Sequence, residues 1–121
     1  MEPILAIKTS TVLLAIAAVG GIVMTLIRLR GAPRPPSSIA MLHGLLAAAA
    51  LTLMLYFGFT TGIAGAAQVA TAILVGAALV GLWLNLQFHS KLEALPVPGI
   101  LIHALVAVAG FAVLLVALFH G

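Results

Sequence analysis

Long apolar stretches alternate with short proline-rich or polar segments along this 121-residue chain. Four stretches have this character, at residues 4–29, 38–60, 63–88 and 98–120. Each is long enough to cross a bilayer as a helix, which takes about 20 residues. Pro33, Pro35 and Pro36 end the first stretch, and Pro98 suits the first turn of the last. The pattern predicts an all-α membrane protein, with a single domain of four transmembrane helices over residues 1–121.

Composition and charge agree with a membrane location. Hydrophobic residues make up 64% of the chain and charged residues 6%, against about 25% charged in soluble domains. The seven charged side chains are Glu2, Lys8, Arg28, Arg30, Arg34, Lys91 and Glu93. Most of the basic ones flank the first and third connections, so the positive-inside rule places these connections in the cytoplasm. We therefore expect a multi-pass protein of a bacterial inner membrane with both termini periplasmic, and no binding of nucleic acid.

The connections between the predicted helices are short, which favours neighbouring helices that run in opposite directions. Ser37 or Ser38 is positioned to cap the second helix. The sequence thus predicts an antiparallel up-down-up-down bundle. Cysteine is absent, and this excludes disulfides, iron–sulfur clusters and covalently attached c-type haem.

The chain also matches itself, without a gap, at an offset of sixty residues. Residues 11–59 align with residues 71–119. The identical pairs include Thr11 and Thr71, Gly21 and Gly81, Pro36 and Pro96, His43 and His103, and Phe59 and Phe119. We predict two parallel two-helix halves related by an axis along the membrane normal.

Each half contributes one histidine at an equivalent depth. His43 and His103 each lie seven residues beyond the paired proline, so both are about 10 Å inside their helices at 1.5 Å of rise per residue. Gly21 and Gly81 reach a similar depth from the opposite direction. The sequence therefore predicts one layer of the bundle in which two diagonal helices supply imidazoles and the other two supply glycines.

Two imidazoles at one depth of an apolar bundle are typical ligands of a metal macrocycle held between helices. The axial nitrogens approach the iron from opposite faces, and the ring edges pass close to neighbouring backbones, which glycine permits. We predict one haem b with His43 and His103 as the metal ligands. The other predicted cofactor-binding residues are Gly21, Gly81, Ala47, Ala107, Arg28 and Arg34. The alanines leave space one turn beyond the histidines, with Met54 and Leu114 closing the pocket below, and the arginines are positioned to pair with haem propionates.

The same residues also allow different roles. The cofactor can be another chlorin or a metal, and paired histidines with small residues can also simply join membrane helices by hydrogen bonds and close packing. His89, Asn85 and Gln87 lie near the cytoplasmic end of the third helix. They either solvate the interface and bond between helices, or contribute to a quinone or proton site. His120 has no second histidine at its depth, so we expect no second haem.

Around residues Leu42–Gly44 and Ile102–Ala104, the chain resembles the small four-helix membrane cytochromes b, in the broad sense that includes cytochrome b561-like proteins. The resemblance covers the bundle architecture and extends residue by residue only to His43 and His103. It implies haem ligation by two histidines between helices, and electron exchange with quinones or partner proteins. Many such proteins hold two haems on four internal histidines, whereas this chain offers two at suitable depth.

The leading hypothesis is an electron-transfer cytochrome rather than an independent enzyme. Its partners, besides the lipid bilayer, are a quinone, a second copy of the chain or a larger redox complex. One alternative is a cofactor-free accessory subunit whose histidines bond across helices. A second is a small transporter or proton-conducting protein, although such proteins typically show broken spans or acidic residues at mid-membrane.

Overall fold

The computed structural model describes residues 1–120, which form four long helices. The helices are α1 (Pro3–Leu29), α2 (Ser37–Phe59), α3 (Gly65–Leu84) and α4 (Val97–His120). A π-helical turn, η1 (Asn85–His89), continues α3, and residues 1–120 contain no strand. All four spans, with α3 and η1 taken together, are long and apolar enough to cross a membrane. This confirms the prediction of an all-helical chain with four candidate membrane spans.

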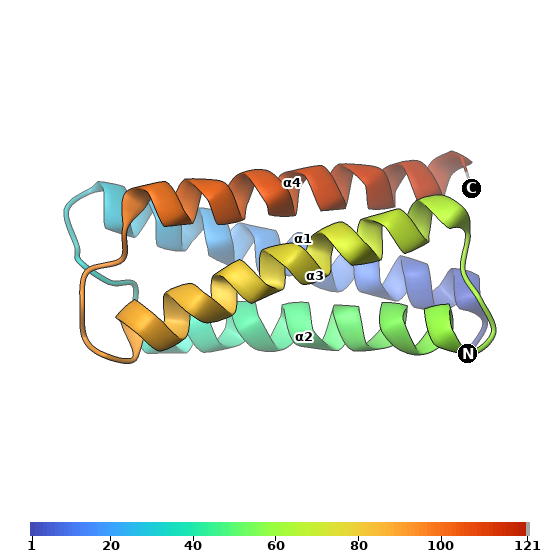
Figure 1. The fold of residues 1–121 in the computed structure, drawn as a ribbon, viewed down its shortest axis with the longest axis horizontal. Coiled ribbons are helices and arrows are strands. Elements are labelled where there is room, and N and C mark those ends of the chain that lie inside the picture. Colours follow the sequence, from blue (N-terminus) through green and yellow to red (C-terminus); the bar gives the residue numbers. More distant parts are fainter. Residues whose placement is uncertain (121) are drawn as a thin grey trace.

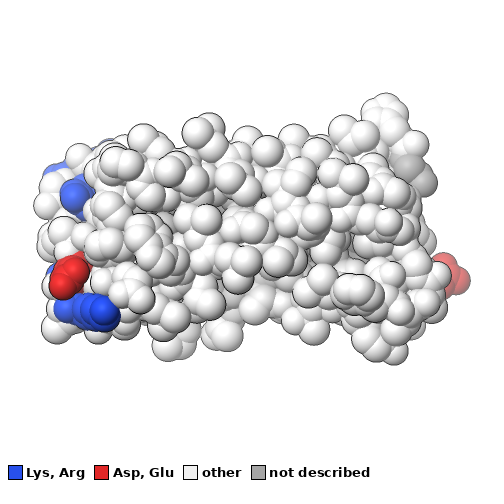
Figure 2. Space-filling model, viewed as in Figure 1, with Lys and Arg blue, Asp and Glu red and all other residues white. Residues whose placement is uncertain are grey.

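The four helices lie alongside one another in an elongated bundle, and the chain doubles back at each connection (Figure 1). The start of α1 and the end of α4 lie at one end, together with the α2–α3 connection. The α1–α2 connection (residues 30–36) and the α3–α4 connection (residues 90–96) lie at the other, here named the loop end. Lys and Arg side chains gather at the loop end, and the face of the long middle section seen in this view carries no charged side chain (Figure 2). This distribution suits a chain whose middle lies in hydrocarbon.

The helices pack as two hairpins. The α1–α2 and α3–α4 interfaces are extensive, and the hairpins meet through smaller α1–α4 and α2–α3 interfaces. The main core lies in the half of the bundle away from the loop end, and its buried residues are Ile7, Leu14, Ala50, Leu51, Met54, Ala67, Ala70, Leu74, Leu114 and Ala117. Ser10 is fully buried beside this core and donates to the carbonyl oxygen of Ala50 at 3.0 Å. Apolar packing and this hydrogen bond together join α1 to α2.

Hydrogen bonds tie the two connections of the loop end to each other. They join Leu95 N to Pro33 O at 3.0 Å, Arg28 Nε to Leu95 O at 2.9 Å, Arg34 Nη1 to Leu92 O at 2.7 Å, and His89 Nε2 to Pro35 O at 3.0 Å. A carbonyl oxygen only accepts, so the side-chain nitrogen donates in each of these side-chain bonds. These bonds link one hairpin to the other beyond the main core, and they fix the arginines and His89 in position.

Two local details differ from the expectations. The predicted serine cap of α2 is wrong: Pro36 occupies the N-cap position, Ser37 is already helical, and no side chain bonds to the first N–H groups. Pro36 takes this position with φ −57° and ψ 139°, and proline is tolerated at a helix start because it has no N–H group to leave unpaired. The third span also ends in a π-helical turn instead of continuing as an α-helix. Such turns are rare and are frequent at functional sites, and this one ends at His89.

Candidate functional site

The histidines of the two aligned halves make the same hydrogen bond. His43 on α2 bonds through Nδ1 to the carbonyl oxygen of Ala17 on α1 at 2.7 Å. His103 on α4 bonds through Nδ1 to the carbonyl oxygen of Ala77 on α3 at 2.8 Å. Ala17 and Ala77 are separated by the same sixty residues as the two histidines. The contact therefore recurs in both hairpins at the offset found in the sequence.

This hydrogen bond determines which ring nitrogen carries the hydrogen. A carbonyl oxygen has no hydrogen to give, so Nδ1 of each histidine must donate. In the neutral imidazole the lone pair then belongs to Nε2, which makes Nε2 the available ligand atom. Histidines that bind metals commonly donate their other ring N–H to a backbone carbonyl in this way. Both histidines are half-buried, so neither is sealed inside the core.

Gly21 and Gly81 leave space that the imidazoles occupy. A Cβ atom built on Gly21 would lie 3.1 Å from Cε1 of His43, and one built on Gly81 would lie 2.9 Å from Cε1 of His103. Both distances are shorter than the optimal carbon–carbon separation of about 3.5–4.0 Å. The structure thus brings together the four residues of the predicted layer, which we name the histidine layer. Clearance of a macrocycle edge by the same glycines stays a prediction.

The two imidazoles approach each other across the bundle. Their ring centroids are 6.1 Å apart and their planes meet at 74°. A metal ion bound by two imidazoles on opposite sides holds the ring centres about 6 Å apart, because each metal–nitrogen bond is about 2 Å long and each nitrogen lies about 1 Å from its ring centre. The observed separation is therefore compatible with one metal between His43 and His103. The helices that supply these residues, α2 and α4, share no extensive interface of their own.

The packed core ends at the histidine layer. Ala50 and Met54 on α2 and Leu114 on α4 are buried almost completely, whereas Ala47 and Ala107, nearer the histidines, are half-buried. On α1, the buried face that ends at Ala17 continues toward the loop end with half-buried residues. These residues are Gly21, Met24, Thr25 and Arg28. The main core fills the bundle on one side of the histidines, and on the loop-end side a smaller core of Leu84, Leu95 and Ile100 is buried at α3, the α3–α4 connection and α4.

Small residues beyond the histidines do not leave open space in the core. A Cβ atom built on Gly110 would lie 2.7 Å from Cγ of Leu74, so this glycine permits the close packing of α3 on α4. Ala50 is fully buried and accepts the Ser10 hydrogen bond. Met54 and Leu114, which the sequence places at the bottom of a pocket, belong to the packed core. A macrocycle at the histidine layer would therefore have to extend toward the loop end.

Arg28 and Arg34 lie at that loop end. Their hydrogen-bond partners are the carbonyl oxygens of Leu95 and Leu92, which carry no net charge. Each guanidinium has five N–H donors, so one such bond leaves donors for an anion. Arg28 joins the end of α1 to the α3–α4 connection, Arg34 joins the first connection to it, and both keep the charge that propionate binding would use.

The remaining polar candidates do not form one site. Asn85 and Gln87 are exposed, and Gln87 accepts a hydrogen bond from Lys91 Nζ at 2.9 Å. His89 instead turns to the first connection, where it bonds to Pro35. Sequence reasoning also missed the carbonyl partners of the two histidines. Ala17-Ala18 and Ala77-Ala78, which are identical in the aligned halves, were a usable signal.

Comparisons of the chain with protein-family models, with curated proteins and with solved structures found no match. The function of the site therefore has to follow from its own geometry. Among residues 1–120, no group of three or more His, Cys, Asp or Glu side chains is arranged to hold a metal ion. Two oriented imidazoles can complete the coordination of a metal only where other atoms supply the remaining ligands.

Proposed function

We propose that this protein is a membrane-embedded cytochrome b that holds one haem between α2 and α4. His43 and His103 are its axial ligands. The proposal rests above all on the matching bonds from Nδ1 of each histidine to a backbone carbonyl, because these bonds leave two Nε2 lone pairs for a metal. The proposal includes a bundle in which neighbouring helices run antiparallel and the two two-helix halves run in the same direction. The bundle lies in a bacterial inner membrane, with the loop end in the cytoplasm.

A macrocycle suits this site better than a bare metal ion. Structural zinc sites use four protein ligands, and catalytic ones use three with an open position. Here the histidine layer provides two imidazoles, whose ring centres are 6.1 Å apart. A porphyrin supplies the four equatorial nitrogens that the chain lacks. The half-buried α1 positions between the histidine layer and the loop end would border it, whereas Leu84, Leu95 and Ile100 on the α3–α4 side are already packed together.

The residues of the chain have distinct roles in this proposal. Bound haem would supply a reversible one-electron couple, whose potential depends on its axial ligands and its surroundings. His43 and His103 would both hold the iron through Nε2, and two imidazole ligands would leave no place for oxygen to bind. The carbonyls of Ala17 and Ala77 orient the rings and raise their basicity. Arg28 pairs with a propionate at the loop end. The electron partner is a quinone, a second copy of the chain or a larger redox complex.

Histidine replacement tests the ligand assignment. We expect His43→Gly and His103→Gly each to abolish or greatly weaken haem binding in protein purified after expression with ample haem. Added free imidazole should restore a low-spin spectrum in both variants, since it can enter the space of the missing ring. His89→Ala and His120→Ala are the controls and should keep the wild-type spectrum. Full haem occupancy in both glycine variants without imidazole would overturn the assignment.

A cofactor-free accessory subunit is the second candidate, because the same bonds join the helices within each hairpin. Hydrogen bonds between membrane helices contribute about 0.6 kcal/mol on average and up to about 1.7 kcal/mol. In this case each histidine substitution would lower the free energy of unfolding by such an amount. The wild-type protein would then show no haem absorption, and added imidazole would change nothing.

A further inference from the structure

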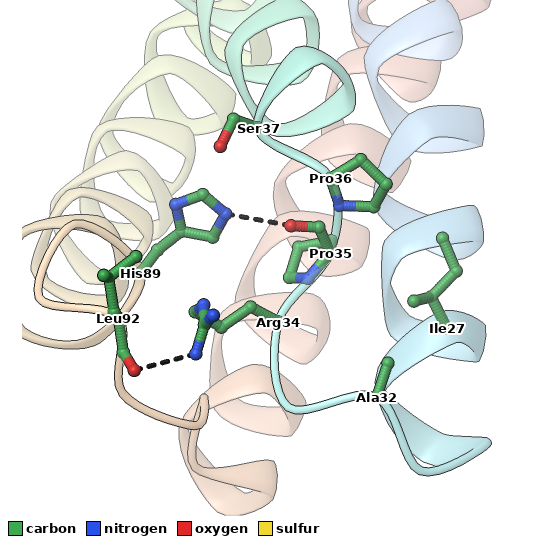
Figure 3. Close-up of a pocket in the computed structure, with 8 residues that line it drawn as sticks. All are labelled: Ile27, Ala32, Arg34, Pro35, Pro36, Ser37, His89 and Leu92. Atoms are coloured by element: carbon green, nitrogen blue, oxygen red, sulfur yellow. Dashed lines mark hydrogen bonds between the residues drawn. The ribbon is translucent and has the colours of Figure 1, made fainter.

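A second polar site lies at the loop end, on the connections and apart from the histidine layer (Figure 3). It is a pocket of about 440 Å³ between the first connection and the end of η1. Its polar lining consists of Arg34, Ser37 and His89, and its other lining residues are apolar. These three side chains come from the first connection, the first turn of α2 and the last residue of η1. The fold, and not the order of the sequence, brings them together.

Two of the polar side chains are held in place by backbone carbonyls. Arg34 Nη1 donates to Leu92 O at 2.7 Å, and His89 Nε2 donates to Pro35 O at 3.0 Å. Figure 3 shows the guanidinium, the imidazole and the Ser37 hydroxyl in neighbouring positions around the pocket. Leu92 has a φ of 59°, a left-handed conformation that non-glycine residues seldom adopt. The carbonyl that accepts the Arg34 bond therefore belongs to a residue with an unusual backbone conformation.

We propose that this pocket binds a phosphate group, from either the headgroup of an anionic phospholipid or a free phosphate. The guanidinium of Arg34 matches the geometry of phosphate oxygens, and its bond to a carbonyl leaves its positive charge available. Ser37 adds a hydroxyl donor. Arg34 lies just before the start of α2, and Ser37 lies in its first turn. A membrane-spanning bundle meets the lipid headgroups at this level.

The surroundings of the pocket also favour an anion. Arg28, Arg30 and Lys91 belong to the same end of the bundle, and the one acidic side chain of these connections is Glu93. Basic pockets beside membrane helices on the cytoplasmic side are suited to anionic headgroups. The uncapped N–H groups at the start of α2 add to the attraction that Arg34 provides. The inference does not require haem, since its residues lie outside the histidine layer and only Arg34 among them is also a candidate partner of a haem propionate.

Binding is measured on the whole protein in neutral detergent. Native mass spectrometry would count bound phosphatidylglycerol and phosphatidylcholine, and thermal unfolding would be followed with each lipid and with inorganic phosphate. We expect phosphatidylglycerol to stay bound and to raise the unfolding midpoint, while phosphatidylcholine has little effect. A comparable rise with inorganic phosphate alone would identify the free anion as sufficient. No effect of either phosphatidylglycerol or inorganic phosphate would overturn the proposal.

Matched variants separate the pocket from general attraction to a basic surface. Arg34→Gln should weaken phosphatidylglycerol binding about tenfold or more, because it removes a charge-assisted hydrogen bond. Lys91→Gln makes the same change of charge at an exposed residue bonded to Gln87, and should leave binding within about twofold. Equal losses in these two variants would overturn the proposal.

Ser37→Ala provides an independent check, since Arg34→Gln also removes a bond that joins the connections. The serine is exposed and caps no helix, so its removal should weaken lipid binding several-fold without lowering stability in detergent. Unchanged binding in Ser37→Ala together with unfolding of Arg34→Gln would contradict the pocket. Haem content is recorded in the same samples. Ser37→Ala protein that loses lipid but keeps its haem separates this inference from the proposed function, because Ser37, unlike Arg34, is no candidate haem partner.

Discussion

The contact between each glycine and imidazole of the histidine layer predicts a ranked series of alanine substitutions. A Cβ atom on Gly81 would lie 2.9 Å from the His103 ring, and one on Gly21 would lie 3.1 Å from the His43 ring. A Cβ atom on Gly76, also on α3, would meet nothing within 4 Å. Gly76→Ala is therefore the matched control for Gly81→Ala.

The expected difference between the variants follows from these distances. Alanine is favoured over glycine inside a helix by about 1 kcal/mol, and this gain is common to all three substitutions. At Gly81 the new methyl group overlaps the ring by about 0.6 Å or more, so His103 must swing away from Ala77. Overpacking costs about 1–3 kcal/mol, and the movement of His103 would also weaken its hydrogen bond to Ala77. We expect Gly81→Ala to be less stable than Gly76→Ala by about 1–3 kcal/mol, with Gly21→Ala between them.

Equilibrium unfolding in mixed micelles of sodium dodecyl sulfate and a neutral detergent measures this difference. Far-ultraviolet circular dichroism reports the helix content at each composition. Haem content of the purified variants should fall in the same order, since the displaced imidazole is a proposed ligand. Equal free energies of unfolding for Gly81→Ala and Gly76→Ala would refute the packing of the histidine layer described above.

Three further predictions test the core, the layer and the orientation. Ser10→Ala removes the buried hydrogen bond to Ala50 and should lower the free energy of unfolding by about 1 kcal/mol. Thr52→Ala is the control, because the exposed Thr52 hydroxyl bonds within its own helix, and it should lower this free energy less. Equal decreases in the two variants would contradict the role of Ser10. Leucine at either glycine of the histidine layer should eliminate haem while the helices still insert, and full occupancy would show that the layer is misplaced. Reporter fusions at Gly121 and near Pro35 should report periplasm and cytoplasm, respectively; an active cytoplasmic reporter at Gly121 would reverse the orientation.

The helix positions were predictable because a bilayer requires long apolar stretches, and prolines mark their limits. The details at the loop end were not. Ser37 has the character of a cap in the sequence, but Pro36 takes the N-cap position. The π-helical turn at Asn85–His89 depends on which backbone groups pair, and the apolar pattern contains no information about that. The pairing of the first connection with the third likewise depends on how the two hairpins dock.

The histidine layer was predictable from depth alone, because equal rise per residue brings residues of equal depth to one level. Gly21 and Gly81 do lie beside His43 and His103. The carbonyl partners of the histidines depend on the rotation of each helix about its axis, which depth does not define. The bonds of Arg28 and Arg34 to the third connection were also unforeseen, since a charge pattern places arginines at an interface without naming their acceptors.

The absorption spectrum of the purified protein, expressed with ample haem and recorded oxidised and then dithionite-reduced, tests the central claim most directly. Two axial imidazoles predict a Soret band with the sharp visible bands of a six-coordinate low-spin haem after reduction, at one haem per chain. Carbon monoxide should not change the reduced spectrum, because no axial position is open. A wild-type protein that is folded and helical but shows no Soret band would contradict the cytochrome account and leave the cofactor-free subunit in its place.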